Sequence, residues 1–253
     1  MKATVSVFWT GGYDSTFRIC QLSRENVTID PYYLSDNRAA EKMELQAIDN
    51  IREKLLDDPA TKAAINPLIY VPADARHKDS RVARAFHRLV TSDFMGSQYE
   101  WLGAFALEHP GIEMSVHKDD KAIALILKYG ALAPENTPYG TCYAVDRDRS
   151  SEDIVVLFGS QRFPLADYTK LRMKREYAQM RLSDIVNETW FCHKPVDGKP
   201  CGICNSCRYT IEEGMSERFS AEALTRYRKY NSPACILQRK MKAVRRALNR
   251  FRP

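Results

Sequence analysis

The sequence contains no long hydrophobic run. Its 253 residues include no apolar stretch long enough to cross a bilayer, and residues 5–9 are too few for the hydrophobic region of a signal peptide. No cleavage-like site follows that stretch. We therefore expect a cytoplasmic protein without a transmembrane segment. In that compartment the seven cysteines are not expected to pair as structural disulfides.

Acidic residues are missing from one end of the chain. From Thr225 onward there are ten Lys or Arg and no Asp or Glu, whereas residues 1–224 carry 28 basic and 32 acidic side chains. The net charge of +6 therefore comes from this tail. Apolar residues recur in the tail at helical spacing: Ile236 or Leu237, Met241, Val244, Leu248 and Phe251.

This pattern predicts a basic amphipathic helix at the C-terminal end. Two interpretations remain open for it. The helix can pack on its own body or on a dimer mate. Alternatively, it can dock on an acidic partner, which would be nucleic acid, a membrane surface or a protein. A homodimer is the oligomeric state that we expect.

Strand and helix patterns alternate over about the first 180 residues. The predicted strands cover residues 4–9, 28–34, 67–71, 112–117 and 153–158, and the predicted helices cover residues 16–23, 38–56, 81–90, 97–108, 119–129 and 168–180. This alternation predicts an α/β fold with a parallel five-stranded sheet and helices on both faces. From about residue 190 the pattern changes to a cysteine-rich loop and basic helices. We therefore expect an α/β domain at 1–186 and a zinc-binding region with a helical tail at 187–253.

A glycine loop follows the first predicted strand, in the stretch FWTGGYDST at residues 8–16. Gly11 and Gly12 permit a tight turn with exposed backbone N–H groups, and Ser15 and Thr16 add hydroxyl donors. The helix that follows directs its positive end to the same place, which makes an anion cradle. Asp14 would repel a phosphate unless a cation bridges the two, so its presence is explained by Mg²⁺ between the carboxylate and a polyphosphate.

Other interpretations of this loop stay open. The glycines can belong to a plain strand–turn–helix connection, and Asp14 can be a helix N-cap. The lysine of a P-loop is absent, and so is the third glycine of the dinucleotide-binding fingerprint.

Four cysteines near the C-terminal end are spaced as C-x8-C-x2-C-x2-C: Cys192, Cys201, Cys204 and Cys207. Four soft ligands in a short loop fit a tetrahedral Zn²⁺ with no open position, which is a structural site. Unrelated buried thiols and a redox Cys-x-x-Cys pair are the alternatives. His193 is a competing ligand. Of the other cysteines, we interpret Cys20 and Cys235 as core or tail thiols, whereas Cys142 could approach the glycine loop.

The motif Thr10-Gly11-Gly12-Tyr13-Asp14-Ser15-Thr16 resembles the Ser-Gly-Gly-X-Asp-Ser motif of the N-type ATP pyrophosphatases. Together with Trp190-X-Cys192 and the Cys-Gly-X-Cys-X-X-Cys run at 201–207, it resembles the 7-cyano-7-deazaguanine synthase family. Arg162-Phe163-Pro164-Leu165, followed by Thr169-Lys170, is also similar to that family. The resemblance spans roughly residues 4 to 212 and is densest at the two ends.

The resemblance implies a fold of the adenine nucleotide alpha-hydrolase type and an ATP-dependent C–N ligase. Such an enzyme adenylates the carboxylate of 7-carboxy-7-deazaguanine, releases pyrophosphate and then AMP, and forms an amide or a nitrile. Thr10 to Thr16 would bind ATP, with Asp14 sharing Mg²⁺ and Ser15 holding pyrophosphate. Lys170 would meet the developing phosphate charge, unless it is a solvated helix lysine. Asp36 would lie at the adenosine end, unless it is a turn residue.

The chain departs from the family pattern at three places. Thr10 replaces a serine. His117-Lys118-Asp119-Asp120 stands where the family carries a segment like Tyr-Pro-Asp-Cys-Arg. Gln98-Tyr99-Glu100-Trp101 opens a helix where the family has an Arg-Asn pair. In this segment Gln98 or Glu100 could contact the edge of the substrate purine and Tyr99 or Trp101 could stack on it, or the aromatic residues belong to the core.

Three alternative functions remain open. Divergent relatives of the family occur in phage-defence operons, and a relative with a docking tail could transfer the activated deazaguanine to an amine of a partner protein. The chain could also be a tRNA-modifying ATP pyrophosphatase whose basic tail holds RNA. The third alternative is a non-catalytic zinc protein that binds nucleic acid.

Overall fold

A computed structural model gives the fold of the chain. It describes residues 2–76 and 78–250, and from residue 243 onward it describes the backbone only. The chain separates into two compact units. The first comprises Met1–Asn37 with Glu44–Trp190, and the second comprises Arg38–Met43 with Phe191–Pro253. The first unit thus ends at residue 190, whereas the sequence places the boundary at residue 186.

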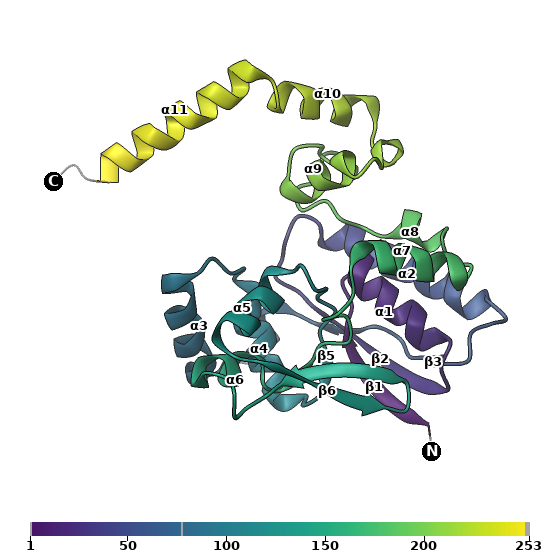
Figure 1. Cartoon of the computed structure of the whole chain (residues 1–253). Helices are drawn as coiled ribbons and strands as arrows, with labels where there is room; N and C mark the ends of the chain where they lie inside the picture. Colours follow the sequence, from purple (N-terminus) through teal and green to yellow (C-terminus); the bar gives the residue numbers. More distant parts are fainter. Residues whose placement is uncertain (1, 77, 251–253) are drawn as a thin grey trace. The chain divides into compact units, whose positions relative to one another are not determined.

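A parallel sheet with β1 at its centre organises the first unit (Figure 1). In the described residues it has six strands: β1 (Ala3–Phe8), β2 (Val27–Leu34), β3 (Ala64–Ile65), β4 (Ile69–Val71), β5 (Ile112–Glu113) and β8 (Gln161–Arg162). Their order is β3-β2-β1-β5-β8, and β4 pairs with β2 next to β3. Where the sequence predicts one strand at 67–71, the structure has two short strands, β3 and β4, which pair with successive parts of β2.

Helices cover both faces of the sheet. They are α1 (Tyr13–Ser23), α2 (Glu41–Asp57), α3 (Ser80–Ser92), α4 (Gln98–Glu108), α5 (Lys121–Tyr129), α6 (Glu152–Phe158), α7 (Lys170–Gln179), α8 (Ile185–Glu188) and the short 3-10 helix η1 (Ala73–Ala75). Val5 and Val7 pack with α1, α2 and α7, whereas Phe8 and Ile112 pack with α3 to α6. The side chains of successive β1 residues therefore point to opposite faces of the sheet and pack in two separate hydrophobic cores. This arrangement confirms the prediction of an α/β fold with helices on both faces of a mostly parallel sheet.

The predicted strand at 153–158 is wrong, because this segment is the helix α6. Its N-cap is Ser151, whose side chain accepts a hydrogen bond from the backbone N–H of Ile154. Ile154, Leu157 and Phe158 are buried, a spacing of three and four that suits a helix. The strand that completes the sheet is β8, which begins only three residues after α6 ends. A short apolar run does not distinguish a strand from a buried helix.

A β-hairpin was not predicted. β6 (Leu132–Thr137) pairs antiparallel with β7 (Gly140–Val145) across a two-residue turn. Gly140 has a φ of +113°, a conformation that a residue with a Cβ rarely adopts. Two features of the sequence could have indicated this hairpin: the glycine at the turn, and the alternation of polar and apolar residues that follows it.

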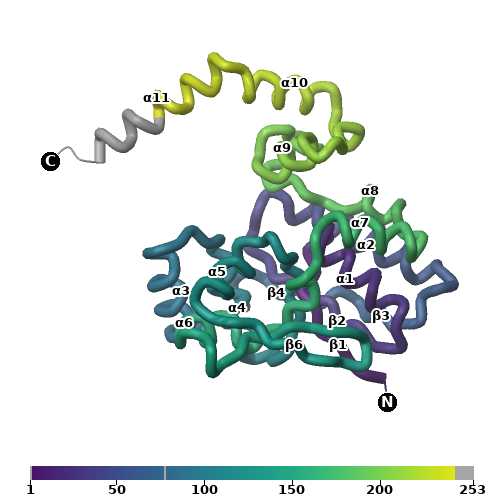
Figure 2. The backbone as a smooth tube through the Cα atoms, in the orientation of Figure 1, coloured from purple at the N-terminus to yellow at the C-terminus, as the bar shows by residue number. Residues whose placement is uncertain are grey.

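The second unit contains the four-cysteine loop and the C-terminal helices. These are α9 (Asn205–Glu212), the 3-10 helix η2 (Ser216–Arg218), α10 (Ala221–Tyr230) and α11 (Pro233–Arg250), of which the last two follow each other in Figure 2. The backbone of α11 confirms that the C-terminal tail is helical, as the sequence predicts. Among the described residues, no helix has the length and apolar character required to cross a bilayer.

One buried ion pair joins α1 to β5. Arg18 donates from Nε and Nη2 to the two carboxylate oxygens of Glu113, at 2.7 and 2.9 Å. Arg18 is 4% exposed and Glu113 is fully buried. The thiol of Cys142 on β7 also donates to Glu113 at 3.4 Å. Each charge of this buried, bidentate pair is compensated only while its partner is present.

Glu113→Gln is expected to destabilise the chain strongly, because Arg18 would keep a buried charge without its counter-ion. Breaking such a pair costs about 3–5 kcal/mol. Equilibrium urea unfolding measures this loss. Arg81→Ala, which breaks the exposed pair with Asp79, should leave the unfolding midpoint unchanged. Equal midpoints for the wild type and Glu113→Gln would contradict the expectation.

Candidate functional site

The candidate site lies where the order of the strands reverses. From β1 the chain runs to β2 on one side, and it returns to β5 on the other. The loops after β1 and after β5 therefore leave the same edge of the sheet in opposite directions. Ligands of open parallel sheets bind in the crevice at such a switch point.

The loop between β1 and α1 has the geometry expected of a tight glycine turn. Gly11 has a φ of +67°, and a Cβ there would lie 2.8 Å from the backbone oxygen of Glu44. The Ser15 hydroxyl accepts from the backbone N–H of Thr10 at 3.3 Å and lies 3.4 Å from the oxygen of Gly12. Ser15 is thus held across the loop. Thr16 is fully buried and its Oγ1 accepts from the indole N–H of Trp9 at 3.1 Å.

The N-cap of α1 is Gly12, with no side chain that caps the helix. The interpretation of Asp14 as the N-cap is therefore wrong. Asp14 lies in the first turn of α1 and binds two basic side chains from other elements. His117 Nδ1 is 3.1 Å from one carboxylate oxygen, and Lys170 Nζ binds the other.

Burial opposes the ionisation of Asp14, but the hydrogen bond with His117 and the charge of Lys170 outweigh it. Together they hold the pKa of this carboxyl group below its usual value. The carboxylate is 22% exposed, so it still reaches solvent at the mouth of the loop. The site thus contains an ionised carboxylate beside two groups that can bind phosphate oxygens.

Lys170 is the first residue of α7, whose N-cap Thr169 accepts from the backbone N–H of Arg172. Its Nζ also lies 4.8 Å from the centre of the Tyr13 ring. The structure therefore brings Lys170 to the glycine loop, from 156 residues away in the sequence. Lys170 is therefore not a helix lysine that contacts solvent alone.

Sequence reasoning missed His117. It follows β5 by four residues, at the same edge of the sheet as Asp14. The signal was available, because residues that follow neighbouring parallel strands meet at one edge. Ser115, between β5 and His117, has a buried hydroxyl without a hydrogen-bond partner among the described residues.

The other predicted site residues lie after β2 and on α4. Asp36 is exposed two residues beyond β2. Gln98 is exposed at the start of α4 and Glu100 is half-buried. Tyr99 is 7% exposed and its hydroxyl bonds to Asp120 at 3.2 Å, so Tyr99 is part of the core. Burial raises its pKa, which keeps the hydroxyl protonated.

Trp101, one turn before Phe105 on α4, contacts a cation. The guanidinium carbon of Arg76 lies 4.7 Å from the centre of the indole ring. Arg76 follows β4 and η1, and its Nη1 is buried without a hydrogen-bond partner among the described residues. Phe105 contacts Phe8 at the end of β1, with ring centres 5.8 Å apart. Among the described residues, this N–H group of Arg76 has no acceptor, and it lies after β4 at this edge of the sheet.

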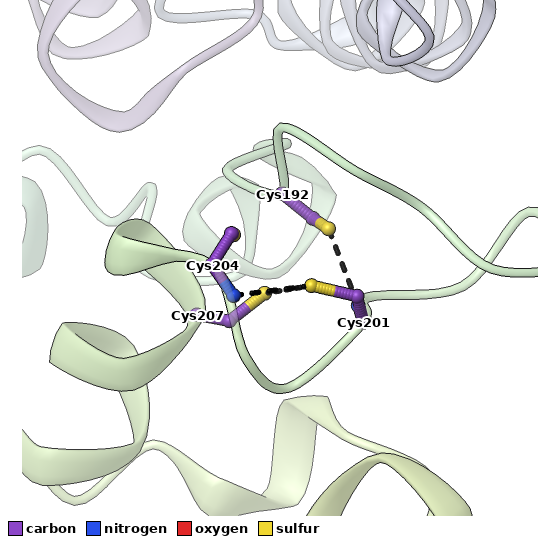
Figure 3. Close-up of side chains that lie close together, drawn as sticks. All are labelled: Cys192, Cys201, Cys204 and Cys207. Atoms are coloured by element: carbon purple, nitrogen blue, oxygen red, sulfur yellow. Dashed lines mark hydrogen bonds between the residues drawn. The ribbon is translucent and has the colours of Figure 1, made fainter. Parts of the chain in front are cut away.

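The four cysteines of the second unit form one cluster (Figure 3). Their sulfur atoms all lie within 4.8 Å of one another. Cys201 Sγ and Cys207 Sγ are 3.8 Å apart, close to the edge of a tetrahedron with Zn–S bonds of about 2.3 Å. The cluster can hold a metal such as zinc.

Backbone groups support this arrangement. Cys201 N–H donates to Cys192 Sγ at 3.2 Å, and Cys204 N–H donates to Cys201 Sγ at 3.3 Å. Gly202 has a φ of +81°, and a Cβ there would lie 2.2 Å from the oxygen of Ala223 on α10. His193 is engaged with Ser206 at 2.7 Å, outside the cluster.

The other three cysteines are not part of this cluster. Cys20 is buried in α1, as expected, and Cys235 lies on α11. Cys142 does not lie in a loop but on β7, where its sulfur contacts Glu113. Burial, with the nearby charge of Glu113, raises its pKa to about 12, so the thiol stays protonated.

Comparison with known proteins does not assign the chain to a family. No model of a protein family matches the chain, and a search of curated proteins finds no significant match. The functional argument therefore rests on the residues and their geometry.

The cysteine cluster predicts one tightly bound zinc per chain. Cys204→Ser should lower the zinc content well below one equivalent, because it removes one of four ligands. Cys235→Ser, outside the cluster, is the matched control and should retain full zinc. Elemental analysis of the purified protein measures both. Full zinc in Cys204→Ser would show that this thiol is not a ligand.

Proposed function

We propose that the chain is an ATP-dependent ligase that activates a carboxylate by transfer of AMP and releases pyrophosphate. The observation that carries this proposal is the meeting of Asp14, Lys170 and His117 at the switch point of the sheet, beside the glycine loop. A carboxylate together with cationic groups at a helix N-terminus suits a polyphosphate and its metal ion.

The loop would bind the β- and γ-phosphates of ATP through its backbone N–H groups and Ser15. Asp14 would hold Mg²⁺, and one carboxylate together with substrate phosphates is a ligand set that this ion uses. The ion would neutralise phosphate charge. Lys170 is bound to the same carboxylate in this structure, so we expect it to turn toward the phosphates when the nucleotide binds. His117, which contacts the other carboxylate oxygen of Asp14, would donate to a phosphate oxygen.

The chemistry proceeds in two displacements. A carboxylate oxygen of the substrate attacks the α-phosphorus of ATP, the bond to the bridging oxygen breaks, and pyrophosphate leaves with the electron pair. Ammonia then attacks the acyl carbon, loses a proton and expels AMP, so that a primary amide forms. Attack of the amide oxygen on a second ATP would release pyrophosphate again, and loss of AMP together with the remaining protons on the nitrogen would give a nitrile. Positioning and charge neutralisation are the tasks of the protein.

We propose a 7-deazaguanine carboxylate as the substrate, because of the resemblance to the 7-cyano-7-deazaguanine synthases. Arg76 and Trp101 support this substrate class. The buried N–H of Arg76 is a donor suited to a carboxylate, and Trp101 provides an aromatic face beside it. Gln98 and Glu100, on the same helix, remain our candidates for contact with the base.

A second candidate function concerns the acceptor. The amine can belong to a partner protein instead of being ammonia, so that the deazaguanine is joined to that protein. The exposed apolar residues and cations of α11 favour a macromolecular partner.

Pyrophosphate release from ATP by the zinc-loaded protein tests the proposal. We expect release that requires 7-carboxy-7-deazaguanine and that Asp14→Asn abolishes, because the variant lacks the charge that holds Mg²⁺. Asp49→Asn, an exposed position of α2, is the matched control and should stay active. Release that is unchanged in Asp14→Asn would refute the assignment of the loop. Release that requires a different carboxylic acid would refute only the substrate class.

Arg76→Gln is expected to raise the KM for the carboxylate substrate by about tenfold or more, because it removes a charge-assisted hydrogen bond. The KM for ATP should not change. Arg84→Gln, an exposed arginine of α3, is the control. Steady-state kinetics of pyrophosphate release give both constants. An equal rise in the KM for ATP would place Arg76 at the nucleotide instead.

A further inference from the structure

α11 presents apolar side chains to solvent. Leu237 and Met241 are 61% and 64% exposed, and Ile236 beside them is 36% exposed. Leu237 and Met241 are four residues apart, so they lie on one face of the helix. The sequence continues the spacing at Val244, Leu248 and Phe251. These three lie outside the residues whose side chains the structure describes.

The opposite face of α11 is the one that packs within the second unit. The guanidinium carbon of Arg239 lies 3.6 Å from the centre of the Tyr230 ring on α10, and that of Arg208 lies 5.6 Å from the same ring. Arg239 is two residues from Leu237, about 200° around the helix. The apolar face therefore points away from α10.

The spacing of the apolar residues suits a single helical partner. Steps of four and three residues from 237 to 251 reproduce the alternation of a and d positions in a heptad repeat. Apart from Ile236, the large apolar residues of this segment lie at such positions only. A stripe of this kind is narrower than the apolar face of a helix that packs on a protein core or lies in a membrane surface. A stripe of a and d positions is typical of the interface between two helices of a coiled coil.

The charges beside the stripe disfavour a second copy of α11 as the partner. The positions that flank an a/d stripe are occupied here by Lys240, Arg245 and Arg252, with Gln238 and Ala247 between them, and none is acidic. Two copies would place cations opposite cations, which is unfavourable. Nucleic acid would suit the charge but would leave the apolar stripe uncovered.

We infer that α11 pairs with an acidic amphipathic helix of a partner protein. The partner would cover Leu237 and Met241 with apolar residues and place Asp or Glu opposite Lys240 and Arg245. α11 belongs to the second unit and the candidate ATP site to the first, and the inference does not depend on the proposed reaction.

The test uses the full zinc-loaded chain and a labelled three-heptad peptide with Leu at a and d and Glu at e and g. A second peptide carries Lys at e and g. Fluorescence anisotropy should show binding of the acidic peptide, weaker at high salt, and no binding of the basic one. Leu237→Ser with Met241→Ser should weaken binding by about tenfold or more, because two apolar side chains lose their burial.

Leu127→Ser, at another exposed leucine, is the matched control for the loss of an apolar side chain. Lys240→Glu with Arg245→Glu should reverse the preference, so that the basic peptide binds and the acidic one does not. Circular dichroism verifies that each variant keeps its helices.

Absence of binding by the acidic peptide overturns the inference, as does binding that the double serine variant leaves unchanged. Two further results would also overturn it. One is a dimer in analytical ultracentrifugation that the double serine variant dissolves. The other is binding of anionic phosphatidylserine vesicles or of tRNA by a chain that does not bind the acidic peptide.

Discussion

The bond between Arg18 and Glu113 determines the geometry of the candidate site. Arg18 lies one turn after Asp14 on α1, and Glu113 lies four residues before His117 on β5. The ion pair therefore joins the two elements that bring Asp14 and His117 together. Because the pair is buried and bidentate, its geometry leaves little freedom for α1 to slide along the sheet. The ion pair therefore restrains the start of α1, and Lys170 contacts Asp14 from a third element.

Much of the first unit could be predicted from its sequence, because the signals are local. The two glycines and the first buried strand indicated the turn after β1, and the spacing of Ala47, Ile51 and Leu55 indicated α2. The segment 153–158 could not be assigned in this way, because an apolar run of that length suits either element. Only the packing of Ile154 and Leu157 against α3 and α4 decides for a helix.

The candidate site also contains residues that the sequence predicts and residues that it does not. The four cysteines were predicted because the ligands lie within sixteen residues and their spacing alone constrains the chemistry. Lys170 was predicted from resemblance, and the structure adds its contact with Asp14. His117 and Arg76 were missed, because their positions depend on where separate strands end relative to one another. Such contacts arise from the order of strands in the sheet, which no single window of sequence contains.

The division into two units has a consequence for how unfolding can be followed. All three tryptophans of the chain, at positions 9, 101 and 190, belong to the first unit. Intrinsic tryptophan emission therefore reports on the sheet and its helices, whereas the four-cysteine loop and α10 have no such fluorophore. Release of zinc to a coloured chelator would report on the second unit alone. The two signals need not coincide, and separate transitions would show that the two units unfold independently.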